Sequence, residues 1–137
     1  MIFKASRQNI LKAGELIKAG ETVAFPTETV YGLGASAYNP AAIAKIYAIK
    51  NRPTFNPLIS HIAEIDFLRD YAVVDERVLA LAKKFWPGPL TFILKRKDNN
   101  SALDLACAGL NKISVRMPNH PVALDLIRAS GVPIVAP

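Results

Sequence analysis

Strand-like and helix-like segments alternate along the whole chain, and this alternation constrains the fold more than any other feature. Apolar residues recur at helical spacing in one set of segments, bounded by typical capping residues: 8–19, 39–50, 75–86 and 119–131. Short apolar runs form the other set: 22–25, 58–62, 91–94, 113–116 and 133–137. This order predicts an α/β fold, a twisted open sheet covered by helices.

Capping residues and breakers set the expected boundaries. Asn39, before Pro40, and Asp75 are expected N-caps, as is Asn119, and Gly131 is expected to end the last helix. Two helices are expected between the strand at 58–62 and the turn at 86–89, the second of them capped by Asp75. The residues at 98–101 predict a turn.

Composition indicates one folded domain with an anionic partner. The 137 residues are 51% hydrophobic, and residues 1–137 are expected to form a single domain. The formal charge of +6 favours a nucleoside triphosphate or an RNA backbone as partner. A basic protein without such a partner would have the same net charge, because net charge does not say where the charges lie.

Cysteine content and hydropathy indicate a cytoplasmic, soluble protein. Cys107 is the lone cysteine and has alanine on both sides, so we expect a buried apolar side chain and no disulfide. The N-terminus lacks the continuous apolar core of a signal peptide, and no stretch approaches the roughly 18 apolar residues of a membrane span. No membrane partner is therefore expected.

Polar residues crowd the loops that follow the first two predicted strands and helices. The stretches 26–34, 50–53 and 56–61 combine hydroxyls, cations, a histidine and glycines. A turn needs Gly or Pro but has no use for so many ligand-type side chains, so the cluster predicts a polar ligand site. In open α/β sheets such residues at strand ends are where ligands bind.

Lys50 and Arg52 form the first candidate anion site. A lysine and an arginine two residues apart can converge on one phosphate or carboxylate. A solvated pair at a helix C-terminus is the other interpretation. The proline-bounded segment 53–57 favours the anion site, because a solvated pair needs no rigid frame. Arg116 ends an apolar strand and must find an anion or water there.

Three other candidates have structural alternatives. Thr27 can serve as a turn residue whose hydroxyl satisfies local main-chain groups. Tyr31 can be a core residue, although the glycines at 32 and 34 indicate that something approaches the main chain closely. A lone histidine in a strand, such as His61, is more often a structural residue than a ligand.

Several motifs together resemble one family. The segments PTETVYGLG, KNRPTFNPLISHI, FWPGPLTFIL, SVRMPNHP and VPIVAP occur in the order found in the YrdC/Sua5 family, the threonylcarbamoyl-AMP synthases that begin the threonylcarbamoyladenosine (t6A) modification of tRNA. The resemblance implies a YrdC-like sheet with a concave, positively charged cleft. One departure is Lys112, which stands where relatives often carry threonine.

The resemblance also assigns substrates and residues. It implies that L-threonine, bicarbonate and ATP are joined to threonylcarbamoyl-AMP with release of pyrophosphate. The implied catalytic residues are Lys50 and Arg52; the threonine site comprises Thr27, Tyr31, Arg52, His61 and Thr91; the nucleotide site comprises Lys50, Arg52, Asn56 and Arg116. tRNA and other tRNA threonylcarbamoylation proteins are the implied partners.

No resident metal site is expected. Glu28 is the only carboxylate near the motif cluster, and no G-x-x-x-x-G-K-[ST] phosphate loop occurs. Magnesium would therefore be carried mainly by the ATP triphosphate, since it usually keeps waters and uses few protein ligands. The absence of a nucleophile with its base suits a reaction that depends on positioning and charge neutralisation.

Two further points concern the extent of the domain and its function. The family continues after VPIVAP into a Ser-x-Asn segment, so the resemblance predicts a domain that is incomplete after Pro137 and impaired in activity. The alternatives are a non-catalytic RNA- or nucleotide-binding module and a carbamoyl-transfer domain of the hydrogenase-maturation type. The sequence lacks the cysteine pairs and the acylphosphatase-like segment that accompany the latter.

Overall fold

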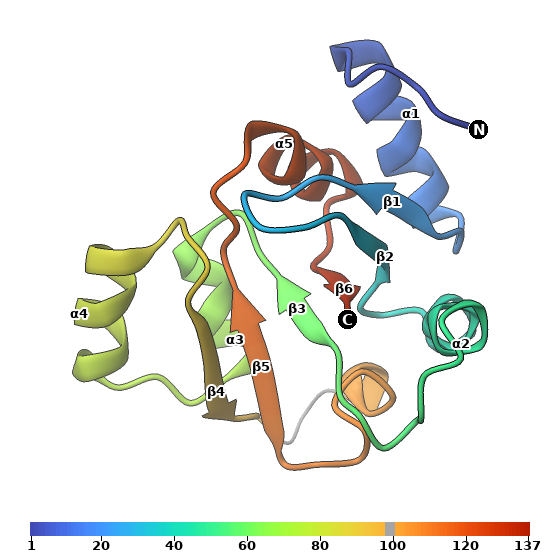
Figure 1. Ribbon diagram of the computed structural model, residues 1–137. Coiled ribbons are helices and arrows are strands. Elements are labelled where there is room, and N and C mark those ends of the chain that lie inside the picture. The colour runs from blue at the N-terminus through green and yellow to red at the C-terminus, as the bar shows by residue number, and fades with distance from the viewer. Residues whose placement is uncertain (98–100) are drawn as a thin grey trace.

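A computed structural model describes residues 1–97 and 101–137 and confirms the α/β fold (Figure 1). The strands are β1 (Val23–Phe25), β2 (Gly32–Ser36), β3 (Ile59–His61), β4 (Thr91–Lys95), β5 (Lys112–Arg116) and β6 (Ile134–Ala136). The helices are α1 (Arg7–Lys18), α2 (Pro40–Ile49), α3 (Leu68–Tyr71), α4 (Glu76–Phe85) and α5 (Pro121–Ser130), with 3-10 turns η1 (Ile65–Phe67) and η2 (Ser101–Leu103). The turn predicted at 98–101 lies largely outside the described residues.

The strands form one mixed sheet in the order β1-β2-β6-β3-β5-β4. β3 and β5 pair in parallel, and the remaining neighbours among the described strands pair antiparallel. β5 therefore lies between β3 and β4, and the carboxyl ends of β3 and β5 meet at one edge of the sheet. β4 begins at that same edge, since it runs in the opposite direction to β5.

The predicted helix caps at Asn39, Asp75 and Gly131 agree with the structure, and the predicted N-cap of α5 does not. The side chains of Asn39 and Asp75 accept from Ala42 N and Val78 N, and Gly131 ends α5 with a φ of 68°. The prediction that Asn119 caps α5 is wrong. His120 is the N-cap, because Pro121 takes the first helical position and the cap falls on the residue before it.

The sequence did not predict β2. Residues 26–34 were expected to form one loop, but β2 starts at Gly32 and pairs with β1. Gly32 and Gly34 make the segment look unlike a strand in the sequence, because glycine has low β propensity. Gly34 is required by packing: a Cβ there would lie 2.5 Å from Ile134 Cγ2 and 2.7 Å from Phe25 Cε1. Side chains of the core therefore approach this main chain.

Two apolar clusters cover the two faces of the sheet. Alternation along each strand places Val115 and Val135 in the larger cluster with α2 and α3, and Ile134 and Ala136 in the smaller one with α1 and α5. Figure 1 shows α1 and α5 beside each other at the β1–β2 end. The smaller cluster does not extend over β4, where Ile93 is 68% exposed. That face of the sheet is therefore open beside α1 and α5.

The packing around Gly34 gives a stability prediction. Gly34→Ala should lower the free energy of unfolding by about 1–3 kcal/mol, the usual cost of overpacking a core. Gly32→Ala is the matched control, because its Cβ would meet its nearest atoms at 3.4 Å, an ordinary contact. Urea denaturation of both variants measures the difference. Equal stability of the two variants would contradict this account of Gly34.

Candidate functional site

Three of the predicted site residues lie in one row across the sheet. Arg116 at the end of β5 is in register with His61 on β3 and with Thr91 on β4. Side chains in register project from the same face of a sheet, so these three share the face that is partly open. The sequence placed each of them at a strand end, and the topology brings these ends together.

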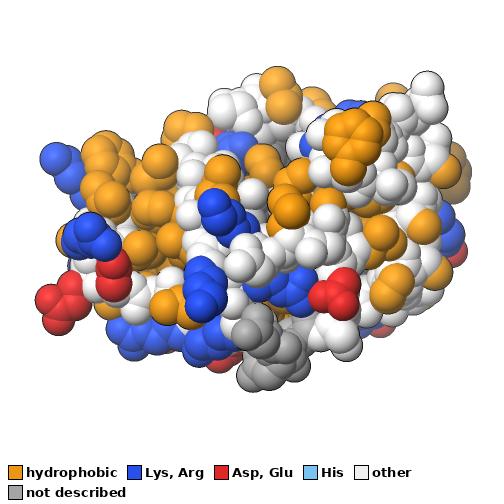
Figure 2. All heavy atoms as spheres, turned by 90° about the horizontal axis from the view of Figure 1, so that it is seen from below, with side chains coloured by type: hydrophobic (Ala, Val, Ile, Leu, Met, Phe, Trp, Pro, Cys, Tyr) orange, Lys and Arg blue, Asp and Glu red, His pale blue; other side chains and the backbone are white. Residues whose placement is uncertain are grey.

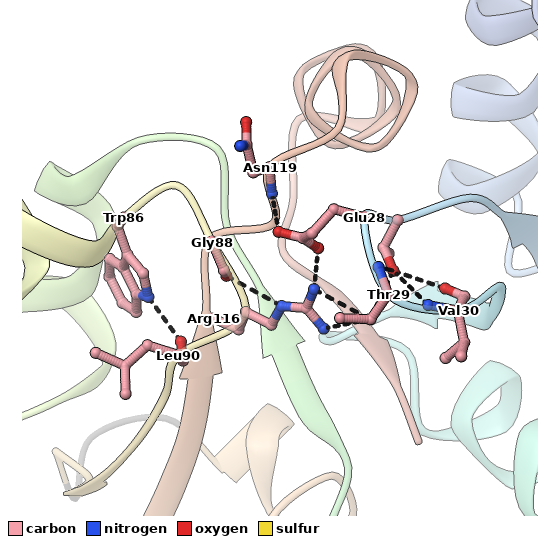
Figure 3. A network of polar contacts seen from close by, with 9 residues as sticks. Glu28, Thr29, Val30, Trp86, Gly88, Leu90, Arg116 and Asn119 are labelled. Atoms are coloured by element: carbon pink, nitrogen blue, oxygen red, sulfur yellow. Dashed lines mark hydrogen bonds and ion pairs between the residues drawn. The ribbon is translucent and has the colours of Figure 1, made fainter.

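Arg116 is the centre of the polar network at this edge (Figure 3). The residue is 8% exposed, and its Nη2 donates to Glu28 Oε1 in an ion pair. Nε donates to the Gly88 carbonyl at 3.2 Å, and Nη1 and Nη2 both lie 3.3 Å from Thr29 Oγ1. Of the two partners expected for Arg116, an anion or water, the structure has an anion, and it is a carboxylate of the chain itself.

Glu28 links the loop 26–31 to a distant part of the chain. Its side chain is 21% exposed, and its second oxygen, Oε2, accepts from the Asn119 main-chain N–H at 2.6 Å. The sequence interpretation named Glu28 only as an isolated carboxylate. The sequence offered one clue to this ion pair. Glu28 is an acidic residue in a hydroxyl-rich loop, Arg116 is a basic residue at the end of an apolar strand, and neither has an evident partner nearby in sequence.

Thr27 organises the same loop. Its Oγ1 accepts from Thr29 N and Val30 N, both at 3.2 Å, and donates to the Val30 carbonyl at 2.6 Å. This is the turn role left open for Thr27 by the sequence. Tyr31, which follows, is 75% exposed and so is available to a ligand.

Arg52 and Asn56 lie in a second group, in the segment between α2 and β3. Arg52 Nη2 donates to the Pro57 carbonyl at 3.0 Å and Nε to the Asn56 carbonyl at 3.4 Å. Tyr47 Oη also donates to the Asn56 carbonyl, at 2.8 Å. These bonds fix the half-buried guanidinium beside the proline-bounded turn. Lys50 is exposed at the C-cap of α2, and the described residues offer it no carboxylate partner.

His61 is buried and neutral. Its Nδ1 lies 3.0 Å from the Ile59 carbonyl and 3.1 Å from the Ile134 carbonyl, so we assign the proton to Nδ1, which leaves Nε2 as an acceptor. The ring also makes an edge contact with Phe25, at 5.8 Å between centroids. The pKa of His61 is lowered to about 4, mainly by burial and to a smaller extent by the charge of Arg116.

Comparison with known proteins places this arrangement in a family. The Sua5/YciO/YrdC model, which carries the description "Telomere recombination", matches residues 15–137. A Psychromonas ingrahamii protein named threonylcarbamoyl-AMP synthase is 32% identical over 99% of this chain and 72% of its own length. The chain belongs to the Sua5/YciO/YrdC family. This confirms the resemblance drawn from the motifs.

Two longer members of the family are more similar in sequence. A Bacillus subtilis threonylcarbamoyl-AMP synthase is 52% identical over 93% of this chain, and the match covers 37% of that relative. The structure of Pyrococcus abyssi Sua5 complexed with L-threonine matches with a TM-score of 0.92 at 45% identity, over 96% of this chain and 38% of that one. The chain thus spans little more than a third of each.

One cavity of the described structure lies away from the predicted site residues. A cavity of about 240 Å³ lies between α5 and the segment after β3, and none of the predicted site residues lines it. Residues 1–97 and 101–137 contain no group of three His, Cys, Asp or Glu side chains placed to hold a metal ion. None of the described helices has the length and apolarity needed to cross a bilayer.

Burial of neutral His61 predicts acid sensitivity. Below its unfolded pKa of 6.5, the unfolded chain binds a proton that the folded chain takes up only near pH 4, so stability falls as the pH drops through this window. Between pH 7.5 and pH 5 this residue should cost about 2 kcal/mol of unfolding free energy.

Urea denaturation at the two pH values checks the effect. The His61→Gln variant should lose less stability than the wild type between pH 7.5 and pH 5, whatever its stability at pH 7.5. An equal loss in both proteins would show that His61 does not cause the acid sensitivity.

Proposed function

We propose that the chain carries substrate-binding residues of an L-threonylcarbamoyladenylate synthase. The enzyme would join L-threonine, bicarbonate and ATP and form threonylcarbamoyl-AMP, pyrophosphate and water. The observation that carries the proposal is the match to Sua5 complexed with L-threonine, at a TM-score of 0.92. Relatives named threonylcarbamoyl-AMP synthase from Bacillus subtilis, Pyrococcus abyssi and Schizosaccharomyces pombe, at 52%, 47% and 44% identity, support it.

The two groups of site residues would divide the work. Lys50 and Arg52 carry charges that no described carboxylate neutralises, and would bind the ATP phosphates or the threonine carboxylate. Asn56 would assist at the nucleotide, and the ATP would bring its own Mg²⁺. Thr91 and Tyr31 would contact threonine beside Thr27 and His61. Neutralising and aligning the reactants would then supply most of the catalysis.

The proposed product implies partners that bear RNA. An adenylate made for t6A modification would be consumed in the cytoplasm by tRNA and other tRNA threonylcarbamoylation proteins. Exposed Lys95 and Lys112 lie directly opposite each other on β4 and β5, and like charges so placed repel. Figure 2, seen from below, shows Lys and Arg side chains gathered at this end of the molecule. A bound polyanion would relieve that repulsion.

The same lysines favour the alternative, a non-catalytic RNA- or nucleotide-binding module. Mass spectrometry of a reaction with L-threonine, bicarbonate and MgATP tests the two. A synthase produces threonylcarbamoyl-AMP and one pyrophosphate per adenylate, and it binds L-threonine in calorimetry. Binding of RNA or ATP with no measurable L-threonine binding would overturn the synthase proposal in favour of the module.

Removing either proposed anion-binding cation should weaken substrate binding. Lys50→Ala or Arg52→Ala should reduce affinity for ATP or L-threonine by about 1.5–3 kcal/mol, the usual value for hydrogen bonds to charged groups. Isothermal titration calorimetry with each ligand measures this. Lys45→Ala is the matched control on the same helix, since Lys45 pairs with Glu21 at 2.9 Å. Unchanged affinity for both ligands would show that neither cation binds a substrate.

Selectivity among amino acids tests the threonine site. Serine should bind more weakly than L-threonine by about 1 kcal/mol, because it lacks one methyl contact. Valine keeps the shape but loses the hydroxyl that Thr91 and the Nε2 acceptor of His61 would contact, so it should bind more weakly still. Competition against labelled L-threonine measures all three. Equal displacement by valine would rule out recognition of the hydroxyl.

A further inference from the structure

We propose that the cavity between α5 and the segment after β3 binds a small organic ammonium ion whose apolar body is about the size of one aromatic ring. None of the residues assigned above to L-threonine or ATP lines this cavity, so its ligand is independent of the proposed function. The volume of the cavity, its apolar wall and the charges at its mouth together define this class of ligand.

The inner wall of the cavity is apolar. Ile62, Ala63 and Ile127 line it and are almost fully buried. The volume of about 240 Å³ exceeds the roughly 150 Å³ of an apolar protein cavity that holds benzene. The cavity therefore has room for one aromatic ring and a short chain.

The mouth of the cavity carries charges. Glu64 and Arg128 belong to the lining, and their side chains are about half exposed. Arg128 Nε donates to Glu64 Oε1 at 3.2 Å, and Arg128 Nη1 lies 3.6 Å from Asp125 Oδ1. One arginine thus faces two carboxylates, which leaves a net negative charge. Phe67 adds an exposed ring to the lining, and aromatic faces attract cations.

The segments on both sides of the cavity are acidic, although the chain as a whole is basic. Residues 64–71 and 121–131 together contain four carboxylates and two arginines, whereas the whole chain has a formal charge of +6. α5 also ends beside the cavity at Gly131, and the C-terminus of a helix carries a partial negative charge. A cationic group at this mouth would be attracted, and an anionic one would be repelled.

A small molecule suits this opening better than a protein surface does. Phe67 is the only large apolar side chain exposed in residues 64–71 and 121–131, all of which the structure describes. The core of a protein interface is depleted in charged residues, whereas charged side chains surround this cavity. The apolar surface available to a partner is therefore confined to the cavity itself.

An NMR titration with phenethylamine, which is an ammonium ion at neutral pH, tests the site. The amides of Ala63 and Val132, which line the cavity, should shift and saturate, and those of Lys50 and Thr91 should not. Phenethyl alcohol has nearly the same shape without the charge. It should bind roughly threefold more weakly, the difference expected for a half-exposed charge pair, and phenylacetate should bind more weakly still.

Three variants test the residues. Glu64→Gln should lower the affinity for phenethylamine roughly threefold and leave that for phenethyl alcohol unchanged. Glu15→Gln, which breaks an exposed pair with Lys18 on α1, is the matched control and should change neither affinity. Val132→Phe should place a ring in the cavity and abolish binding of both probes.

The wild-type titrations decide the outcome even if Val132→Phe does not fold. Equal affinity for all three probes would overturn the assignment of a cation. Absence of saturable shifts, or shifts centred on Lys50 and Thr91, would overturn the site itself. Shifts of the Ala63 and Val132 amides that depend on protein concentration, without any probe, would show that a second copy of the chain fills the cavity and would also overturn the proposal.

Discussion

The buried charge of Arg116 is the constraint on which the geometry of this site depends. A guanidinium at the end of an interior strand must be paired and hydrogen bonded, because an isolated buried charge is strongly unfavourable. Its acceptors come from the turn at Gly88 and from the loop 26–31. Three segments far apart in sequence are therefore fixed relative to one another by a single side chain.

The sheet explains why the loop needs such a tie. α1 and α5 cover the β1–β2 end of one face, and the same face is exposed at Ile93 on β4. A loop at the boundary between covered and open sheet has few apolar contacts of its own, so polar bonds must hold it. Gly34 contributes on the same face, since the absence of a Cβ lets Phe25 and Ile134 of the smaller cluster pack against the hairpin.

Local patterns in the sequence predicted the parts of this structure that depend on local physics. The α/β order, the caps at Asn39 and Asp75 and the end of α5 at Gly131 follow from residues within one turn of the boundary. The row of Thr91, Arg116 and His61 could be anticipated as strand-end residues, but its register could not. β2 was missed because its glycines serve tertiary packing, and tertiary packing overrides propensity.

The ion pair between Glu28 and Arg116 could not be derived from local patterns at all. It joins residues 88 positions apart, and nothing near Glu28 in sequence indicates its partner. The sequence did indicate that Arg116 needs an anion or water, and phosphate was the natural candidate for the anion. The structure shows that a carboxylate of the chain meets the same requirement, and nucleotide binding by Arg116 stays a prediction.

Thr91, Arg116 and His61, which lie in register across the sheet, contribute little net charge to the proposed site. His61 and Arg116 are in register, and two cations so close would repel, but burial keeps His61 neutral near pH 7. The charge of Arg116 is balanced by Glu28. This end of the sheet therefore presents hydrogen-bonding groups with little net charge. We infer that Lys50 and Arg52 would attract an anionic substrate electrostatically. The row of Thr91, Arg116 and His61 would instead discriminate between substrates by their shape and hydrogen-bonding groups.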